Sequence, residues 1–418
     1  MSEQLVIVGN GMAAARLVEE LTTREPGRYA IAVVGEEPAL AYNRVLLSSL
    51  LAGEVGKEDI ELKSQSWWKT RGVTLVYGRR ATGIDVNTRQ VRLEGGAALS
   101  FSKLVLATGS EAIRLPLPGA DLPGTLTFRD VSDVGAITAQ AGPGKRAVVI
   151  GGGLLGLEAA YGLAKTGAAV TVVHLMVHLM DRLMERQLDD RAGEMLKHAL
   201  EARDIDVLLE AQSTAIEGQD KVEGLRLSDG SVLPADLIVM AAGIRPRAEL
   251  ARDAGLAVER GIVVDDCMQT SAPGVYALGE CAEHRGLCYG LVEPAYEQAR
   301  VLAQHLAGKQ TAYEGSLLAT NLKVSGVDVF SAGDFLGGPG TEPILFSDKE
   351  HGVYRKVVVK EGRLAGAVLV GDAADALWYL DLIRSGASIA AMREDLVFGR
   401  AFCAATEDAS EAPQAEAA

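Results

Sequence analysis

Two stretches of the sequence, LVIVGNGMAA at residues 5–14 and AVVIGGGLLG at residues 147–156, each place a short apolar run directly before a glycine-rich turn. Such a run, bounded by a glycine turn, is typical of a buried strand, and the alanine- and leucine-rich residues after it favour a helix. A further apolar strand follows each helix, at residues 29–34 and 169–173. The sequence therefore predicts an α/β fold with an internal duplication of strand–turn–helix–strand units.

The two turns share the glycine spacing of a dinucleotide-binding turn. In such a turn the first glycine makes the bend, the second lets the backbone approach a pyrophosphate, and the third small residue keeps the helix close to the strand. Free N–H groups and the positive end of the helix then hold the phosphates. One match is weak evidence, but here both matches follow a predicted strand and open a predicted helix. The three places are filled by Gly9, Gly11 and Ala14 in the first turn and by Gly151, Gly153 and Gly156 in the second.

The residues at the ends of the following strands distinguish the two ligands. Glu36 follows Ala14 by 22 residues, where a carboxylate accepts hydrogen bonds from an adenosine ribose, as a resident FAD requires. The equivalent strand of the second unit ends at His174. Because no carboxylate stands there to repel a 2′-phosphate, the sequence does not distinguish NADH from NADPH as the coenzyme. We predict two Rossmann-like domains, the first binding FAD and the second NAD(P)H.

Length and composition exclude several other classes of protein. The 418 residues suffice for roughly two or three domains. The net charge of −15 argues against a partner with a phosphate backbone or an anionic membrane surface. The N-terminal apolar run lacks the basic flank of a secretory signal, and no stretch approaches the roughly 20 apolar residues of a membrane helix. We expect a cytoplasmic protein with neither nucleic acid nor membrane as a partner.

Changes of pattern along the chain suggest the domain boundaries. Three prolines and a glycine between residues 116 and 123 mark the first boundary, and the apolar strands at 104–109 and 237–243 look like crossings between domains. From Tyr313 onward short strands alternate with glycine turns before a helix near residues 377–385. The expected parts are a discontinuous FAD-binding domain of residues 1–115 and 241–312, an NAD(P)-binding domain of residues 116–240, a small C-terminal α+β domain of residues 313–403, and a disordered acidic tail of residues 404–418.

Six segments carry a resemblance to a known family: AYNRVLLSSLLAGE at 41–54, LVLATGS at 104–110, VIGGGLLGLEAAYGLAKTGAAVTVVH at 149–174, LMERQLD at 183–189, AAGIRPR at 241–247 and VYALGECAEHRGLCYGLVEPAYEQARVLA at 275–303. The chain resembles the pyridine-nucleotide-dependent FAD reductases related to glutathione and ferredoxin reductases. Within them it is most similar to the flavin-binding N-terminal half of assimilatory NAD(P)H nitrite reductases and to the diaphorase subunit of assimilatory nitrate reductases. The resemblance implies a glutathione-reductase-like fold.

The resemblance also implies roles for single residues. Arg44 matches a basic residue near phosphate or flavin, Glu280 stands where many relatives have the aspartate that binds the ribitol chain, and Glu158 matches an acid beside the nicotinamide. The turn of Thr108 and Gly109 closes over the cofactor, and Pro294 begins a helix whose N-terminus faces the flavin. The expected FAD residues are Gly9, Gly11, Ala14, Glu36, Arg44, Thr108, Gly109, Glu280 and Pro294, and the expected NAD(P)H residues are Gly151, Gly153, Gly156, Glu158 and His174.

The cysteines depart from the pattern of the disulfide reductases. Those enzymes need a CxxxxC pair near the first helices, and no cysteine precedes Cys267. The spacing of the four cysteines matches no common iron–sulfur site. Cys281 and Cys288 invite a redox-active reading, but a small buried apolar role is commoner for free cysteine. We predict that the electrons leave for a partner protein.

Two weaker signals favour structural roles over binding sites. His174 and His178 are four residues apart, a spacing that binds metal on a helix, but His174 should end a strand, so we predict no metal site. Trp67 and Trp68 indicate helix packing rather than an aromatic recognition site.

The leading hypothesis is an NAD(P)H-oxidising FAD subunit that passes electrons to a nitrate or nitrite reductase. In such a protein the flavin carries the chemistry and no residue acts as an essential general acid or base. A rubredoxin or ferredoxin reductase is the alternative enzyme. A slow-turnover nucleotide-sensing flavoprotein is the alternative of another class.

Overall fold

The computed structural model describes residues 2–175, 183–184, 186–324 and 326–403. The chain divides into two compact units. The first unit comprises residues 1–113, 129–134 and 243–316, and the second comprises residues 114–128, 135–242 and 317–418. Each unit contains one of the two predicted nucleotide turns.

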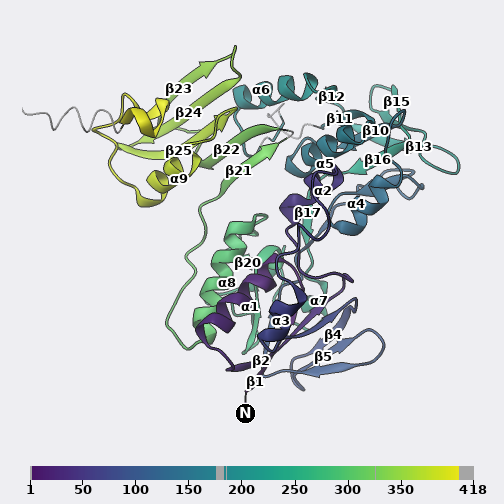
Figure 1. The fold of residues 1–418 in the computed structure, drawn as a ribbon, viewed down its shortest axis with the longest axis vertical. Coiled ribbons are helices and arrows are strands. Elements are labelled where there is room, and N and C mark those ends of the chain that lie inside the picture. The colour runs from purple at the N-terminus through teal and green to yellow at the C-terminus, as the bar shows by residue number, and fades with distance from the viewer. Residues whose placement is uncertain (1, 176–182, 185, 325, 404–418) are drawn as a thin grey trace, which may run out of the picture. The chain divides into compact units, whose positions relative to one another are not determined.

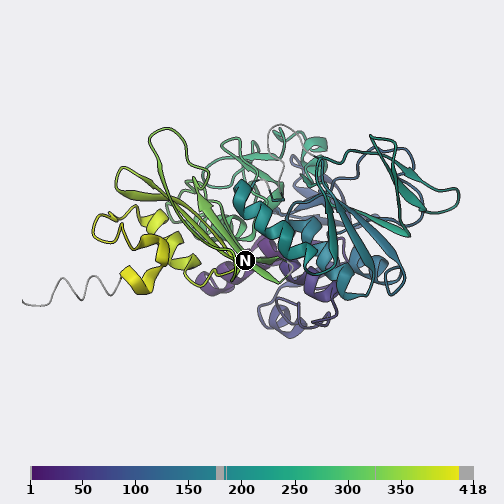
Figure 2. The same cartoon turned by 90° about the horizontal axis from the view of Figure 1, so that it is seen from above.

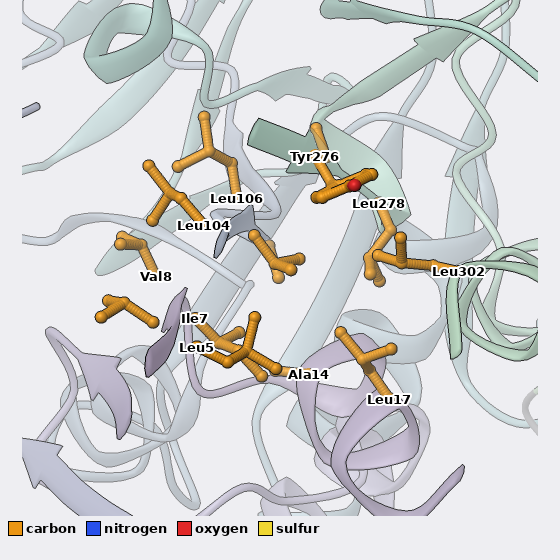
Figure 3. Close-up of a cluster of buried hydrophobic side chains, with 14 of the residues drawn as sticks. Leu5, Ile7, Val8, Ala14, Leu17, Leu104, Leu106, Tyr276, Leu278 and Leu302 are labelled. Carbon is orange, nitrogen blue, oxygen red and sulfur yellow. The ribbon is translucent and has the colours of Figure 1, made fainter. Parts of the chain in front are cut away.

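A five-stranded parallel sheet forms the centre of the first unit, in the order β19-β7-β1-β2-β3. Its strands are β1 (Glu3–Val8), β2 (Tyr29–Gly35), β3 (Thr74–Tyr77), β7 (Lys103–Leu106) and β19 (Val275–Ala277). Helices α1 (Met12–Arg24) and α8 (Val292–Leu306) pack against each other, and Leu17 of α1 and Leu302 of α8 belong to the same buried cluster as Leu5 and Ile7 of β1 (Figure 3). Strand β1 is apolar on both faces because helices and loops cover both sides of a parallel sheet.

The second unit repeats this plan with a parallel sheet in the order β12-β11-β10-β16-β9 (Figure 1). Its strands are β9 (Thr125–Thr127), β10 (Arg146–Ile150), β11 (Ala169–Val173), β12 (Ile205–Leu208) and β16 (Leu237–Met240). Helix α5 (Leu154–Lys165) joins β10 to β11, and α6 (Asp190–Glu201) precedes β12. The internal duplication and both strand–turn–helix–strand units are therefore confirmed.

The same unit contains an antiparallel sheet in the order β21-β22-β25-β24-β23. Its strands are β21 (Ala319–Val324), β22 (Val327–Gly333), β23 (Glu342–Asp348), β24 (Val353–Lys360) and β25 (Arg363–Val370). Helix α9 (Ala376–Ser385) packs on one face of this sheet through contacts with β22 and β25 (Figure 1; Figure 2). The predicted α+β character of the C-terminal part is confirmed.

The described chain also contains smaller sheets and short helices. Two three-stranded sheets contain β4 (Ala81–Asp85), β5 (Gln90–Leu93) and β6 (Ala98–Ser100), and β13 (Ser213–Glu217), β14 (Gly224–Leu227) and β15 (Val232–Pro234). Two strand pairs contain β8 (Ser110–Ala112) with β17 (Ile244–Pro246), and β18 (Ile262–Val264) with β20 (Ala282–His284). The short helices are η1 (Arg44–Leu46), α2 (Leu47–Leu51), α3 (Gln65–Thr70), α4 (Val131–Thr138), α7 (Glu249–Asp253), η2 (Gly279–Cys281) and η3 (Leu396–Phe398).

The structure tests some of the remaining expectations and leaves others untested. Trp68 is buried in α3 with Trp67 packed edge-on against it, at 5.0 Å between ring centroids, as expected for helix packing. His178 and residues 404–418 lie outside the described residues, and the three-domain boundaries stay a prediction. Over the described parts of the chain, no helix has the length and apolar character to cross a membrane.

Candidate functional site

The first nucleotide turn leaves an open cradle at the start of α1. Gly9 has a φ of +116°, and a Cβ there would lie 2.0 Å from the carbonyl oxygen of Ala107, so only glycine fits. Gly11 is the N-cap of α1, and among the described atoms a Cβ on it would meet nothing within 4 Å. The N–H groups of the first helical turn need acceptors from outside the helix. A diphosphate satisfies them at the positive end of the helix.

Glu36 follows β2 beside this turn and is paired with a residue from a distant segment. Nη1 of Arg247 lies 3.3 Å from Oε2 of Glu36. The backbone of Arg247 is fixed on the β7–β8 turn, because its N–H donates to the carbonyl of Gly109 at 2.9 Å and Thr108 Oγ1 donates to its carbonyl at 2.6 Å. The predicted cofactor-closing turn therefore positions an arginine over the predicted ribose residue.

Glu280 lies at the same site, held by a largely buried arginine. Nη2 of Arg129 donates to the carboxylate of Glu280 and to Ser110 Oγ, the latter at 2.8 Å. A Cβ on Gly109 would lie 4.0 Å from Oε2 of Glu280, and a Cβ on Gly279 would lie 3.1 Å from that of Ala13. These contacts bring Glu280 to the start of α1, next to the open cradle.

Arg44 belongs to a second ion pair, which a hydrogen bond links to Arg129. It forms a salt bridge with Glu37, and its Nη1 donates to the carbonyl of Arg129 at 2.9 Å. Tyr42 Oη donates to Oε2 of Glu37 at 2.6 Å. Burial lowers the pKa of Arg129, although Glu280 opposes the shift, and its Nε has no hydrogen-bond partner among the described residues. Two clustered guanidinium groups, one with an unused donor, fit a diphosphate ligand.

One detail of the sequence prediction is wrong. Helix α8 begins at Val292 with Leu291 as its N-cap, so Pro294 does not begin the helix but lies within its first turn. Proline is tolerated in the first turn because the N–H groups there have no partner within the helix. A Cβ on Gly279 would lie 3.9 Å from Ala295 Cβ, so the start of α8 still lies beside the same site.

The second nucleotide turn has the same construction. Gly151 has a φ of +125°, and a Cβ on it would lie 2.3 Å from the carbonyl oxygen of Ala241. Gly156 packs so closely on Gly151 that a Cβ would lie 1.9 Å from the Gly151 carbonyl oxygen. Gly153, the N-cap of α5, leaves open space among the described atoms. This turn also fits a diphosphate.

Two polar side chains accompany the second turn. Nδ1 of His174 accepts a hydrogen bond from the N–H of Gly152 at 3.1 Å, so this nitrogen faces the turn rather than solvent. Glu158 is buried in α5, and desolvation raises its pKa to about 8. It is therefore largely protonated at neutral pH and able to donate a hydrogen bond.

The structure thus brings the predicted residues into two clusters, and it adds residues that the motifs did not single out. Arg129, Arg247 and Glu37 belong to the first cluster but lie outside the glycine-rich turn. The only sequence signal for Arg247 was its place in the AAGIRPR segment. Arg129 reaches Glu280 across 151 positions, which no local pattern predicts.

The sequence of residues 3–305 matches the model of the pyridine nucleotide-disulphide oxidoreductases. The chain belongs to this family. Its members are FAD-dependent oxidoreductases that use a pyridine nucleotide, so FAD and NAD(P)H are the cofactors of this chain. Residues 319–387, which contain strands β21–β25 and helix α9, match the rubredoxin NAD+ reductase C-terminal domain.

The sequences of two curated relatives align with most of this chain. A nitrite reductase [NAD(P)H] of Bacillus subtilis is 46% identical over 388 residues, which are 93% of this chain and 48% of that protein. An assimilatory nitrate reductase electron transfer subunit of the same organism is 42% identical over 94% of this chain and 51% of its own length. The chain therefore spans about half the length of these two relatives.

Relatives of similar total length include ferredoxin and rubredoxin reductases. The ferredoxin–NAD(+) reductase component of the Paraburkholderia xenovorans biphenyl dioxygenase system is 36% identical over 68% of both chains. The reductase in a solved putidaredoxin reductase–putidaredoxin complex superimposes with a TM-score of 0.85, with 26% identity and coverage of 98% of this chain and 99% of that one. NADH:rubredoxin oxidoreductase of Clostridium acetobutylicum gives a TM-score of 0.76, with 26% identity over 94% and 97% of the two chains.

The cysteines carry no disulfide in this structure. All four are free, Cys281 is buried, and burial raises its pKa. Its Sγ donates to the carbonyl of Leu106 at 3.4 Å, as a small buried side chain does. Within the described ranges, no three His, Cys, Asp or Glu side chains are grouped to hold a metal ion.

Proposed function

We propose that this protein oxidises NAD(P)H and passes the electrons, through its FAD, to a separate nitrate or nitrite reductase. The observation that carries the proposal is the likeness to the nitrite reductase and to the nitrate reductase electron transfer subunit, which covers 93–94% of this chain. Both relatives are about twice as long as the matched region, so we infer that the acceptor site lies in other domains or in a partner. FAD, when bound, supplies the change from hydride to single-electron chemistry.

The residues of the chain have the task of holding and aligning the two nucleotides. Arg44 and Arg129 neutralise the FAD diphosphate, Glu36 accepts from the adenosine ribose, and Glu280 accepts from the ribitol chain. Protonated Glu158 donates a hydrogen bond to the carboxamide of the nicotinamide. The gain comes from orientation, since a correctly placed pair of reactants avoids much of the entropic cost of meeting. None of these side chains acts as an essential general acid or base.

The purified protein provides the first test. We expect a yellow protein with one FAD, reduced rapidly by NADH or NADPH. Mixed with the catalytic subunit of an assimilatory nitrate or nitrite reductase, it should support pyridine-nucleotide-dependent reduction of nitrate or nitrite. A protein that is reduced rapidly but delivers electrons only to rubredoxin or ferredoxin would contradict the proposed partner.

A rubredoxin or ferredoxin reductase is the second candidate. The match of residues 319–387 to the rubredoxin reductase C-terminal domain and the likeness to the biphenyl dioxygenase component favour it. A yellow preparation that NADH and NADPH reduce only slowly would favour the slow-turnover nucleotide-sensing flavoprotein instead, and a colourless, inert preparation would contradict both enzyme hypotheses. We also propose the three domains set out above, with residues 313–403 as the third, and a cytoplasmic location, which cell fractionation tests.

A further inference from the structure

A buried aspartate joins the second nucleotide-binding sheet to the C-terminal sheet. Asp189 is the N-cap of α6, and its Oδ1 accepts from the N–H of Ala192 at 3.0 Å. Its Oδ2 accepts from Tyr354 Oη at 2.8 Å and lies 3.2 Å from Nζ of Lys356. The three side chains of this junction are only 8%, 1% and 8% exposed, for Asp189, Tyr354 and Lys356 respectively. A carboxylate buried with three donors is fixed in place, because losing any donor leaves charge or polar atoms unpaired.

The residues just before Asp189 are bound to the second nucleotide turn. The N–H of Met184 donates to the carbonyl of Gly152 at 2.9 Å, and the N–H of Leu188 donates to the carbonyl of Met184, also at 2.9 Å. Leu183 is fully buried, and a Cβ on Gly152 would lie 2.7 Å from its Cδ2. The Gly152 N–H donates in turn to His174. A short path of contacts therefore runs from the turn to Asp189.

Alternate residues of β24 point to opposite faces of the C-terminal sheet, so only some of them contact α6. Tyr354 and Lys356 of β24 face α6, whereas Arg355 between them pairs with Asp372 and donates to the carbonyl of Phe398. Successive residues of a strand point to opposite faces. Helix α6 also packs against β25. The junction is thus the polar part of a contact between α6 and the C-terminal sheet.

We propose that Asp189, Tyr354 and Lys356 are positioning residues for the pyridine nucleotide: the C-terminal sheet, through Asp189, Leu188 and Met184, holds the Gly151–Gly153 turn in its binding geometry. None of the three needs to touch the nucleotide. The inference rests on the assignment of the second turn to NAD(P)H in the proposed function. It gives the C-terminal domain a role in coenzyme binding, beside any role in docking a partner.

The experiment compares two buried tyrosines in the FAD-loaded, full-length protein. Tyr354→Phe removes the bond to Asp189, and the control Tyr379→Phe removes an equally buried bond, from Tyr379 Oη to the carbonyl of Leu396 at 2.6 Å, that stays within the C-terminal domain. The probe is NAD+ if the wild type oxidises NADH faster, and NADP+ if it oxidises NADPH faster. Its binding is measured by calorimetric titration. We expect Tyr354→Phe to raise the Kd roughly 5-fold, with KM raised and kcat at saturation and FAD content unchanged, while Tyr379→Phe leaves the Kd at the wild-type value.

Lys356→Met provides a second variant, in case Tyr354→Phe affects folding. It should also raise the Kd, and the two changes together should raise it by less than the product of the single effects, since both act through Asp189. Equal losses of thermal stability in both tyrosine variants, with every Kd within 2-fold of the wild type, would overturn the inference and leave a purely structural junction. A wild type that binds neither nucleotide overturns the proposed function as well.

Discussion

The guanidinium of Arg247 lies 3.3 Å from the carboxylate of Glu36, although the two residues are 211 positions apart in the chain. Both side chains are about half exposed, so the ion pair contributes little to stability by itself. The ion pair matters because it orients Glu36, the residue proposed to hold the adenosine ribose. The hydrogen bonds from Thr108 and to Gly109 fix the backbone of Arg247.

Arg247→Met should therefore speed the loss of FAD without unfolding the protein. Glu36 then loses the group that orients it, and we expect FAD to dissociate about 5-fold faster, which corresponds to about 1 kcal/mol. Recovery of flavin fluorescence after dilution measures the rate. Arg245→Met is the matched control. Arg245 lies two residues before Arg247 in the sequence and forms an exposed ion pair with Glu111. Equal rates in the two variants would show that the pair has no part in FAD binding.

Arg129→Met should weaken FAD binding more strongly. The change removes a largely buried charge and leaves Glu280 without its ion-pair partner. Hydrogen bonds to charged groups contribute about 1.5–3 kcal/mol, so the Kd of FAD should rise by at least roughly 10-fold. The FAD-to-protein ratio after purification and a titration of the apoprotein measure the effect. Arg146→Met, which breaks the exposed pair with Asp236, should keep full FAD content.

Two glycine substitutions should separate folding from cofactor binding. In Gly9→Ala the new Cβ collides with the Ala107 carbonyl at a positive φ, so the apoprotein should lose about 1–3 kcal/mol or more of stability. In Gly11→Ala the methyl group enters open space among the described atoms, so the apoprotein should keep its melting temperature and lose FAD affinity. Thermal unfolding of both apoproteins, followed by FAD titration, tests this. Unchanged FAD affinity in Gly11→Ala would contradict the assignment of the cradle.

Glu158 makes stability depend on pH in a defined direction. Its pKa is raised from 4.5 to about 8 by desolvation, so the folded protein keeps a proton that the unfolded chain releases. Folding stability is therefore unaffected by this group below pH 4.5 and falls as the pH rises from 4.5 to 8. Glu158→Gln should remove this loss, so its stabilising effect should be near zero at pH 4.5 and grow to a few kcal/mol at pH 8. Denaturant unfolding at pH 5, 6.5 and 8 measures it; a constant difference at all three would contradict the shift.

The sequence anticipated the parts of the fold that depend on local pattern. Strand β11 has the limits expected from its apolar run at residues 169–173, and helix α5 follows the glycine turn that begins at Gly151. Local patterns also place Glu36 after β2. They could not give the start of α8, which lies two residues before Pro294, because several residues around Leu291 are compatible with a helix start. The partners of Asp189 also needed the structure, since Tyr354 and Lys356 lie on a strand far from it in the sequence.

The sequence by itself determined that the chain has two dinucleotide-binding units, because backbone geometry permits only glycine or small residues at fixed places in such turns. It also determined that no cysteine pair lies near the first unit. Only the tertiary structure decided which distant charges complete the sites. Arg129 meets Glu280, Arg247 meets Glu36, and Lys356 meets Asp189. Such pairs depend on where crossing strands and loops bring the backbone, and charged side chains are common along the whole sequence, so spacing carries no signal for them.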